Sequence, residues 1–403
     1  MRRVLVTDSS RGSAISIIRS LGRRGYYVIA ADSEARSPGY YSRYTSERLR
    51  YPPPSKAPEA AVATLLETAR KRRVELIVPV TDEVALPLSD ARERFEGACV
   101  LALPDRRAFA RTCDKLATLE LAAEIGLPAP RTALVATVRE SLEAAPSLGW
   151  PVVLKPRRSR IYRDGGPVER YEVSYAEDAS ALAAGMRRLE GHSEVLLQEY
   201  YRGEGQGVEL LMYRGRPLAA FQHRRLREVP ITGGASSFRE SVSLDPLLYD
   251  YSVRFLAALE WTGLAMVEFK LGREGPRLME INGRVWGSLP LAVKSGMDFP
   301  VRMAELYLGN HPEADSPPDT TYTLGVRSRN LDLELLWIGS ALRRTRLSQS
   351  LPLPGRRQAL AAALRLFYPG DGFDVLVWDD PRPGLVEIAR IAAKLRRKLG
   401  DGR

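Results

Sequence analysis

In the first hundred positions, short runs of apolar residues alternate with stretches in which the apolar residues recur at helical spacing. Residues 4–7 and 26–32 are apolar runs, and the apolar residues at 14, 17, 18 and 21 between them lie on one face of a helix. Another run at 76–80 follows a helical stretch near 60–70, and 99–103 has the same character. This alternation predicts a Rossmann-like α/β module of parallel strands joined by helices. Thr81, Asp82 and Glu83 directly follow a strand, at the edge where such sheets place ligands.

The pattern changes near residue 105. DKLATLELAAEIGLPAP (114–130) predicts a helix that ends at Gly126, and WPVVLKP (150–156) is a short strand closed by proline. The stretch 194–225 predicts a strand, a glycine-rich turn at GEGQG (203–207) and two antiparallel strands. LAMVEFKL (264–271) and PRLMEINGR (276–284) predict a hairpin. An α+β region therefore follows the first module, up to a proline-bearing boundary at HPEADSPPDT (311–320).

The composition describes a large folded protein. The chain has 403 residues, of which 44% are hydrophobic, and this supports two or three domains with buried cores. Two cysteines and three histidines cannot supply a disulfide framework or a zinc site of ordinary ligand spacing. The opening MRRVLVTDSS has an apolar run that Asp8 ends too early for a signal peptide, and no run approaches the roughly 18 apolar residues of a membrane span. We therefore expect a cytoplasmic protein.

The formal net charge of +11 raises the question of anionic partners. Basic patches occur at 157–163, 223–227 and 394–398, without an RNA-binding signature or interleaved aromatic residues, so nucleic-acid binding is not expected. The last predicted helix has basic residues opposite an apolar face of Leu385, Ile388, Ala392, Leu395 and Leu399. Two interpretations stay open for this helix: peripheral contact with an anionic membrane or a partner, or docking onto the protein with a solvated basic face.

The predicted hairpin carries the strongest chemical signal. Side chains alternate between the two faces of a strand, so Glu280, Asn282 and Arg284 would share one face if the strand continues that far. Glu268 on the neighbouring strand adds a second carboxylate. Such hard oxygen ligands suit Mg²⁺, which commonly takes one or two carboxylates together with substrate phosphates. The alternative is an exposed strand face whose charges are simply solvated.

Two lysines favour the first interpretation. Lys155 ends an apolar strand just before a proline, and Lys115 follows Asp114 at the start of the same region. Each lysine alone is typical of a protein surface. Phosphate oxygens would satisfy both ammonium groups, so the lysines and the acidic hairpin together indicate a site for Mg-ATP.

The ordered series of these motifs resembles the ATP-grasp superfamily, specifically its branch of carboxylate-amine ligases and carbamoyl-phosphate-synthase-like enzymes. The resemblance covers roughly residues 1–309 and rests on the Rossmann-like module, DKLAT, WPVVLKP, LLQEYYRGEGQG, VEFK and MEINGR. It implies an α/β and α+β fold with a pre-ATP-grasp domain at 1–105 and an ATP-grasp domain of two α+β subdomains at 106–310. The lid subdomain would span about 130–198, and residues 311–403 would form a C-terminal extension.

The resemblance also implies roles for individual residues. Lys115 and Lys155 would contact ATP phosphates, and Glu268, Glu280 and Asn282 would bind Mg²⁺ or Mn²⁺. Arg284 would act in catalysis with Lys155 by meeting the γ-phosphate or the acyl phosphate. The nucleoside would be held by the following residues of one segment: Gln198, Glu199 and Tyr201 at the adenine edge, and Glu204 at the ribose.

Two loops depart from the family pattern or extend it. The loop after WPVVLKP reads RRSRIYRDGG, with glycines only at Gly165 and Gly166, where many relatives are rich in glycine and serine. The stretch HRRLREVPITGGASS (223–237) is interpreted either as a solvated hairpin rim or as a substrate loop. The substrate interpretation uses one arginine of the basic run, Arg225 for example, and backbone donors near Thr232 and Gly233. Trp286 and Ser288 would border the acceptor pocket, unless Trp286 is a structural tryptophan.

The leading functional prediction is an ATP-dependent ligase that activates a small carboxylate as an acyl phosphate and couples it to an amine. Other ATP-grasp chemistry, such as carboxylation or phosphorylation of a small molecule, is the nearest alternative. A nucleotide-binding protein without catalysis is the third, and it is disfavoured because Glu268, Glu280, Asn282 and Arg284 are all present.

Overall fold

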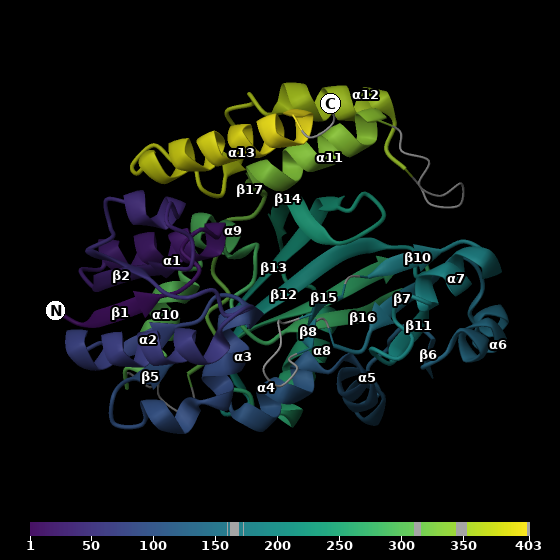
Figure 1. Cartoon of the computed structure of the whole chain (residues 1–403), viewed down its shortest axis with the longest axis horizontal. Coiled ribbons are helices and arrows are strands. Elements are labelled where there is room, and N and C mark those ends of the chain that lie inside the picture. Colours follow the sequence, from purple (N-terminus) through teal and green to yellow (C-terminus); the bar gives the residue numbers. More distant parts are fainter. Residues whose placement is uncertain (159, 162–168, 172, 310–315, 344–352, 401–403) are drawn as a thin grey trace.

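Three larger β-sheets and one two-stranded sheet are found in the described part of the chain in the computed structural model (Figure 1). The structure describes residues 1–158, 160–161, 169–171, 173–309, 316–343 and 353–400. In Figure 1 the N-terminal sheet lies at the left, the long strands of the largest sheet cross the centre, and a small sheet lies at the right. Three C-terminal helices form a layer along the top.

The N-terminal sheet has five parallel strands in the order β3-β2-β1-β4-β5. Its strands are β1 (Arg3–Val6), β2 (Tyr27–Asp32), β3 (Glu47–Arg50), β4 (Leu76–Val78) and β5 (Val100–Leu101). They are connected by α1 (Gly12–Arg23), η1 (Pro38–Tyr41), α2 (Pro58–Arg72), α3 (Asp82–Asp90) and η2 (Arg92–Phe95). The predicted apolar face of the first helix is fully buried, because it packs against the sheet. The predicted parallel α/β module is confirmed.

A small subdomain follows two short helices, α4 (Arg106–Cys113) and α5 (Lys115–Glu124). Its sheet is antiparallel in the order β10-β7-β11-β6. Its elements are β6 (Thr132–Val135), α6 (Val138–Leu148), β7 (Val152–Pro156), β8 (Arg160–Ile161), β9 (Glu169–Arg170), β10 (Ser174–Ala176), α7 (Ala179–Met186) and β11 (Val195–Glu199). Strands β8 and β9 form a separate pair. Leu154, Leu182, Val195 and Leu197 belong to a core of its own, which makes this subdomain a distinct packing unit.

The central sheet has seven strands in the order β16-β15-β12-β13-β14-β17-β18. Its strands are β12 (Glu204–Tyr213), β13 (Arg216–Val229), β14 (Ala235–Val242), β15 (Gly263–Gly272), β16 (Gly275–Asn282), β17 (Arg327–Arg329) and β18 (Gly372–Phe373). One helix, α8 (Pro246–Ala258), lies between β14 and β15 in the chain. Two more, α9 (Leu289–Lys294) and α10 (Phe299–Tyr307), follow β16. The predicted hairpin of LAMVEFKL and PRLMEINGR is the antiparallel pair β15 and β16. Strand β16 ends at Asn282, so Arg284 lies beyond the strand.

The predicted glycine-rich turn at GEGQG is wrong, because residues 204–207 belong to strand β12. Side chains of β13 cross over β12 at these glycines and leave no room for a Cβ there. A Cβ on Gly205 would lie 2.9 Å from Cδ of Arg225, and a Cβ on Gly207 would lie 2.5 Å from Cε1 of His223. Glycine in a strand can mark either a turn or such a close approach, and here it marks the second.

The C-terminal residues complete the central sheet and then cover it. Strands β17 and β18 join its edge, and the helices α11 (Leu331–Arg343), α12 (Arg356–Arg365) and α13 (Arg382–Gly400) form the upper layer of Figure 1. This region is also tied to the N-terminal domain, since Arg19 Nε lies 2.9 Å from Asp380 Oδ2 and both side chains are buried. The segment after residue 320 is therefore integrated with both large sheets.

Helix α13 is docked, but the predicted apolar face contributes little to the docking. Leu385, Ile388 and Leu395 are 59%, 40% and 50% exposed, whereas Ile391 at the edge of the same stripe is 8% exposed. Lys394 Nζ binds Asp332 of α11 at 3.0 Å, and Arg390 pairs with a glutamate of the N-terminal domain. The apolar stripe therefore faces outward, contrary to an interpretation in which it packs on the protein. None of the helices in the described ranges is long and apolar enough to cross a membrane.

Candidate active site

Two carboxylates face each other on the β15–β16 hairpin. Glu268 and Glu280 are cross-strand partners, and Asn282 follows two residues along β16. The Asn282 amide donates a hydrogen bond of 2.9 Å from Nδ2 to Glu268 Oε1. The structure thus brings together the three predicted metal ligands, although their placement alone does not assign the role. In the part of the chain that the structure describes, no group of three or more His, Cys, Asp or Glu side chains could hold a metal ion, so a metal here would need amide or phosphate oxygens as well.

Lys115 and Lys155 lie on the same side as Glu280. The three residues line one cavity of about 20 Å³, together with Gln198 and Leu278. Lys115 Nζ donates to the Pro156 carbonyl at 3.1 Å, which holds it beside the end of β7. The two lysines, far apart in sequence, are therefore adjacent parts of one site.

A helix cap positions Lys115. The Asp114 carboxylate accepts a hydrogen bond of 3.0 Å from the backbone N–H of Leu116, so Lys115 occupies the first turn of α5. Arg157, just after β7, holds the same carboxylate at 2.9 Å and also pairs with Glu194 at 2.7 Å. The Asp114 carboxylate satisfies the free N–H groups of this helix end, so the positive charge at this position comes from the ammonium group of Lys115. Gly165 and Gly166 of the loop after β7 lie outside the described residues.

Enclosure changes the protonation equilibria of these groups. Burial lowers the pKa of Lys155 to about 8, the charges of Lys115 and Lys270 add to the effect, and Glu280 opposes it. Burial also lowers the pKa of Lys115. Solvent reaches Glu280 from the cleft, yet the surrounding protein and Glu268 raise its pKa while the two lysines oppose the rise. A cleft in which several charged groups are destabilised in this way is typical of a functional site.

Arg284 is held by the N-terminal domain. Its Nε and Nη2 donate at 2.7 and 2.8 Å to the two carboxylate oxygens of Asp82, and Nη1 donates at 2.7 Å to the Val285 carbonyl. Asp82 begins α3 near the carboxyl end of β4, the sheet edge at which ligands were expected. The condition under which Arg284 would share the strand face of Glu280 is not met, because β16 ends two residues earlier. The bidentate pair instead fixes the guanidinium at the junction of two domains.

The four residues predicted at the nucleoside have different surroundings. Gln198 is buried, donates at 2.9 Å from Nε2 to Thr132 Oγ1, and has an Oε1 without a hydrogen-bond partner among the described residues. The Glu199 carboxylate binds Arg131 at 2.6 Å, and the Tyr201 hydroxyl donates at 2.6 Å to the carbonyl of residue 275. Glu204 is exposed at the start of β12. Of the four, Gln198 shares the small cavity with the lysines.

The basic run on β13 is engaged in ion pairs. Arg225 Nη2 lies 2.5 Å from Glu268 Oε2, and Nη1 lies 3.1 Å from Glu228 Oε1. On either side of it, Arg224 pairs with a carboxylate of β14 and Arg227 with Glu334 of α11. Arg225 therefore links the carboxylate pair of the hairpin to strand β13. No motif in the sequence indicates this pairing, because it depends on which strands are neighbours.

The remaining predicted substrate residues fall into two groups. Thr232 and Gly233 lie in the loop between β13 and β14, where the Gly233 carbonyl accepts a hydrogen bond of 3.2 Å from the Tyr175 hydroxyl of the small subdomain. Trp286 is fully buried and packs edge-to-face on Phe299, with ring centroids 5.4 Å apart. Ser288 is buried and donates at 3.0 Å to the carboxylate of residue 209. The structure thus places Trp286 and Ser288 in the interior, which corresponds to the structural interpretation of Trp286.

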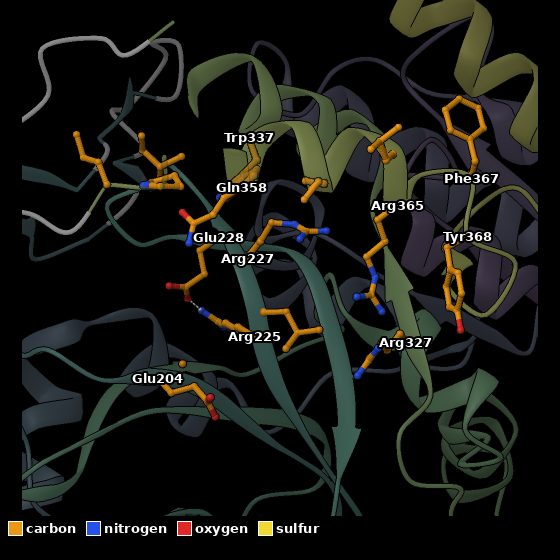
Figure 2. A pocket seen from close by; sticks show the side chains of 18 of the residues that line it. Glu204, Arg225, Arg227, Glu228, Arg327, Trp337, Gln358, Arg365, Phe367 and Tyr368 are labelled. Carbon is orange, nitrogen blue, oxygen red and sulfur yellow. Dashed lines mark hydrogen bonds and ion pairs between the residues drawn. The ribbon is translucent and has the colours of Figure 1, made fainter. Parts of the chain in front are cut away.

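A second, much larger cavity lies between β13 and the C-terminal helices (Figure 2). It measures about 1300 Å³ and reaches from Glu204 and Arg225 to α11 and α12. Arg225 lines this cavity and also binds Glu268, so the cavity adjoins the carboxylate pair. No sequence pattern in the C-terminal region predicts it.

Comparison with known proteins agrees with the fold. Residues 192–330 match the family model described as ATP-grasp in the biosynthetic pathway with Ter operon. A formate-dependent phosphoribosylglycinamide formyltransferase of Parasynechococcus marenigrum is 30% identical over 154 residues, which are 38% of this chain and 36% of that protein. The chain thus spans about a third of the length of this relative, and about half of several similar ones.

Solved structures extend the likeness over most of the chain. The biotin carboxylase domain of the Hydrogenobacter thermophilus 2-oxoglutarate carboxylase has a TM-score of 0.63 at 16% identity, covering 81% of this chain and 73% of that one. An L-amino acid ligase from Bacillus licheniformis has a TM-score of 0.60 at 15% identity, covering 79% and 78%. The predicted resemblance is confirmed: residues 192–330 match an ATP-grasp family model, and most of the chain shares its fold with these solved structures.

Proposed function

We propose that the protein is an ATP-dependent ligase that couples a carboxylate to an amine and releases ADP and phosphate. The observation that carries the proposal is the cluster of two lysines and two carboxylates at one cleft. Lys115, Lys155 and Glu280 line the same cavity, and Glu268 lies opposite Glu280 on the hairpin. The lysine ammonium groups match the negative charge of a triphosphate, and the carboxylates match the positive charge of its metal ion.

The residues present fit Mg-ATP. Glu268, Glu280 and the amide oxygen of Asn282 would hold Mg²⁺, or Mn²⁺, and two carboxylates with an amide form a hard-oxygen donor set of the kind that these ions prefer. The bound ion would neutralise phosphate charge and orient the triphosphate. Gln198 Oε1, a buried acceptor without a partner among the described residues, would accept a hydrogen bond from the adenine amino group. The neighbouring segment with Glu199, Tyr201 and Glu204 would border the nucleoside.

The protein's own charges would act on the transferring phosphoryl group. A carboxylate oxygen of the substrate attacks the γ-phosphorus, the bond to the β-phosphate oxygen breaks, and ADP leaves with that electron pair. Lys115, Lys155 and Arg284 stabilise the negative charge, and Asp82 keeps the Arg284 guanidinium in place. An amine then attacks the acyl carbon, phosphate departs, and the amine loses a proton to water. An amide results.

The supporting evidence comes from geometry and from relatives. Related proteins are named as a formate-dependent formyltransferase and an L-amino acid ligase, and a neighbouring structure contains MgADP with bicarbonate. These names concern the relatives, and for this chain they support the class of reaction without naming its substrates. Cys99 and Cys113 are free thiols, which agrees with the reducing cytoplasm that we propose as its location.

ADP release by the purified protein tests the proposal. Mg-ATP is supplied with pooled carboxylates and amines, and the products are analysed by mass spectrometry. A product lighter than its two parents by one water is expected. A phosphorylated or carboxylated product would transfer the protein to other ATP-grasp chemistry. Absence of Mg-ATP binding would contradict nucleotide chemistry altogether.

We also propose that the outer face of α13 contacts anionic membranes. Leu385, Ile388 and Leu395 form an exposed apolar stripe, and Arg396 and Arg397 beside it are exposed. An exposed apolar stripe with flanking cations suits the interface of a negatively charged lipid surface. Replacing the three apolar residues by serine should abolish co-sedimentation with vesicles of anionic phosphatidylglycerol. Equal binding by the triple variant, or no preference over neutral phosphatidylcholine vesicles, would contradict this contact.

A further inference from the structure

The proposed chemistry leaves the cavity of about 1300 Å³ between β13 and α12 without an occupant (Figure 2). Pockets for drug-sized ligands measure about 300 to 1000 Å³, so this one exceeds the needs of formate or of a small amino acid. Its walls come from the beginning of β12, from β13 and from the C-terminal helices α11 and α12. The C-terminal region therefore builds half of a pocket next to the ATP-grasp site.

The position of the cavity connects it to the reacting groups. Glu204 and Arg225 form its edge toward the hairpin, and Arg225 is in contact with Glu268 at 2.5 Å. A molecule in the cavity would therefore have one end beside the carboxylate pair at which we propose that ATP and Mg²⁺ bind. This placement suits a substrate better than a distant regulator.

Arginines are the commonest charged residues of the lining. Four arginines line the cavity, at positions 225, 227, 327 and 365, against two acids, Glu204 and Glu228. Figure 2 shows Arg227, Arg327 and Arg365 around the cavity, and they come from three different elements, β13, β17 and α12. Each of the four arginines is also paired with a carboxylate, so the lining offers guanidinium N–H groups to an anion rather than a large net charge, and it offers an ammonium group few acceptors.

Two of these arginines can still bind an incoming anion. Arg327 donates to Glu240 through Nε and Nη2, both at 2.7 Å, and Arg365 donates to Asp371 through Nε at 2.6 Å and Nη2 at 3.3 Å. Within the described residues, neither Nη1 atom has a partner. Both side chains are about one-third exposed to solvent. Each guanidinium is thus fixed at one edge by an acid and open at the other, an arrangement that suits recognition of a carboxylate.

Apart from Gln358, the side chains of the remaining lining are apolar or aromatic. Trp337 is 7% exposed, whereas Leu364 and Phe367 are 76% and 86% exposed and Tyr368 is 55% exposed. Exposed large apolar side chains at the rim of a cavity are costly unless a ligand covers them. The lining therefore combines cationic groups with an apolar and aromatic wall.

We infer that the carboxylate substrate is an amphipathic organic acid, with an aromatic or alkyl body that lies against α11 and α12. This inference rests on the proposed ligase function and specifies its acid substrate. The arginines attract the anion, the apolar wall selects the body, and the cavity volume admits molecules far larger than formate. The C-terminal region is then a specificity element of the ligase.

Direct binding to the full-length protein tests the inference separately from catalysis. Dissociation constants are measured by calorimetry for 3-phenylpropionate and octanoate, with acetate and formate as size controls and 3-phenylpropylamine as the charge control. Each titration is run with and without Mg-ADP. We expect the two large acids to bind at least about tenfold more tightly than the three controls, because they alone match both parts of the lining.

Two variants and two matched controls locate the binding. Ala361→Trp would fill the cavity from an exposed position of α12, and Leu360→Trp next to it is the control because Leu360 is exposed and outside the lining. Arg365→Gln removes an anion contact, while Asp371 keeps its ion pair with Arg329, and Arg356→Gln on the same helix is its control. The two lining variants should weaken binding of the large acids at least fivefold, and the controls should not.

The outcomes separate the inference from the ligase proposal. Equal affinity for acetate and the large acids, tighter binding of the amine, or unchanged affinity in both lining variants would overturn the inference, even if Mg-ATP still binds and turns over. Failure of Mg-ATP binding with selective acid binding retained would instead remove the ligase proposal and leave an amphipathic-acid site.

Discussion

Arg225 on β13 binds Glu268 on β15 across the intervening strand β12, with 2.5 Å between Nη2 and Oε2. The crossing takes place at Gly205, where a Cβ would lie 2.9 Å from the arginine Cδ. Glu268 is also the cross-strand partner of Glu280. The Arg225 guanidinium therefore offsets the repulsion between the Glu268 and Glu280 carboxylates. A bound metal ion would have the same effect as this guanidinium cation.

Removal of that cation should destabilise the metal-free protein. Arg225→Gln leaves Glu268 facing Glu280 without its guanidinium, and loss of one partner of an enclosed ion pair costs about 3–5 kcal/mol. We expect a lower melting temperature in thermal denaturation and a larger rise on adding Mg²⁺ than the native protein shows. Arg224→Gln is the matched control, because Arg224 is 40% exposed and its partner Glu240 keeps Arg327. The same melting temperature for both variants would exclude a special role of Arg225.

Lys155 should make nucleotide binding depend on pH. Its pKa in the free protein is about 8 because burial disfavours the charged form, whereas contact with phosphates would raise it. Below about pH 7 the ammonium is charged in both states, so affinity for Mg-ADP stays constant. As pH rises above 8, binding must take up a proton, so the dissociation constant should increase toward about tenfold per pH unit.

Calorimetric titration with Mg-ADP between about pH 7 and 9.5 measures this dependence. Lys155→Arg is the matched variant, since arginine keeps its charge over the whole range and should give a flatter profile, in which Lys115 is the remaining buried ammonium group. Identical slopes for the native protein and the variant would assign the pH dependence to another group.

Asp82 should act by positioning Arg284. Asp82→Asn weakens the bidentate contact that holds the guanidinium at 2.7 and 2.8 Å. We expect kcat to fall by roughly tenfold or more while the KM for ATP changes little, because the arginine would serve the transition state rather than ground-state binding. Asp90→Asn at the exposed end of the same helix is the control. A rise in KM with unchanged kcat would place Arg284 in nucleotide binding instead.

The sequence indicates the ligand-bearing strands better than it indicates the pockets. Glu268, Glu280 and Asn282 could be placed together from the two-residue period of a hairpin, because β15 and β16 are adjacent in sequence and in space. The association of Lys115 with Lys155 rested on their shared phosphate chemistry, because α5 and β7 meet through tertiary contacts that no local pattern shows.

Other features depend on which strands and helices become neighbours. From their neighbours in sequence alone, Gly205 and Gly207 suggest a turn. They lie in a strand because the side chains of β13 leave no room for a Cβ, and this depends on which strand is the neighbour. Likewise, the pocket between Glu204 and Arg365 depends on β17 and β18 joining the central sheet, which brings the C-terminal helices over it. Short local patterns cannot predict such long-range joins.

Glu280 provides the sharpest test of catalysis. Glu280→Gln preserves shape and removes one charge from the carboxylate pair, so Mg²⁺ placement should fail and ATP turnover should fall by about 100-fold or more. The fold should persist, because solvent reaches this side chain and a polar exchange at such a position usually changes the free energy of unfolding by little. Glu274→Gln on the same hairpin is the control, since Glu274 is 79% exposed and should leave turnover unchanged. ADP release with the true substrates, compared with melting temperatures of both variants, distinguishes catalysis from stability, and native turnover in Glu280→Gln would refute the proposed metal site.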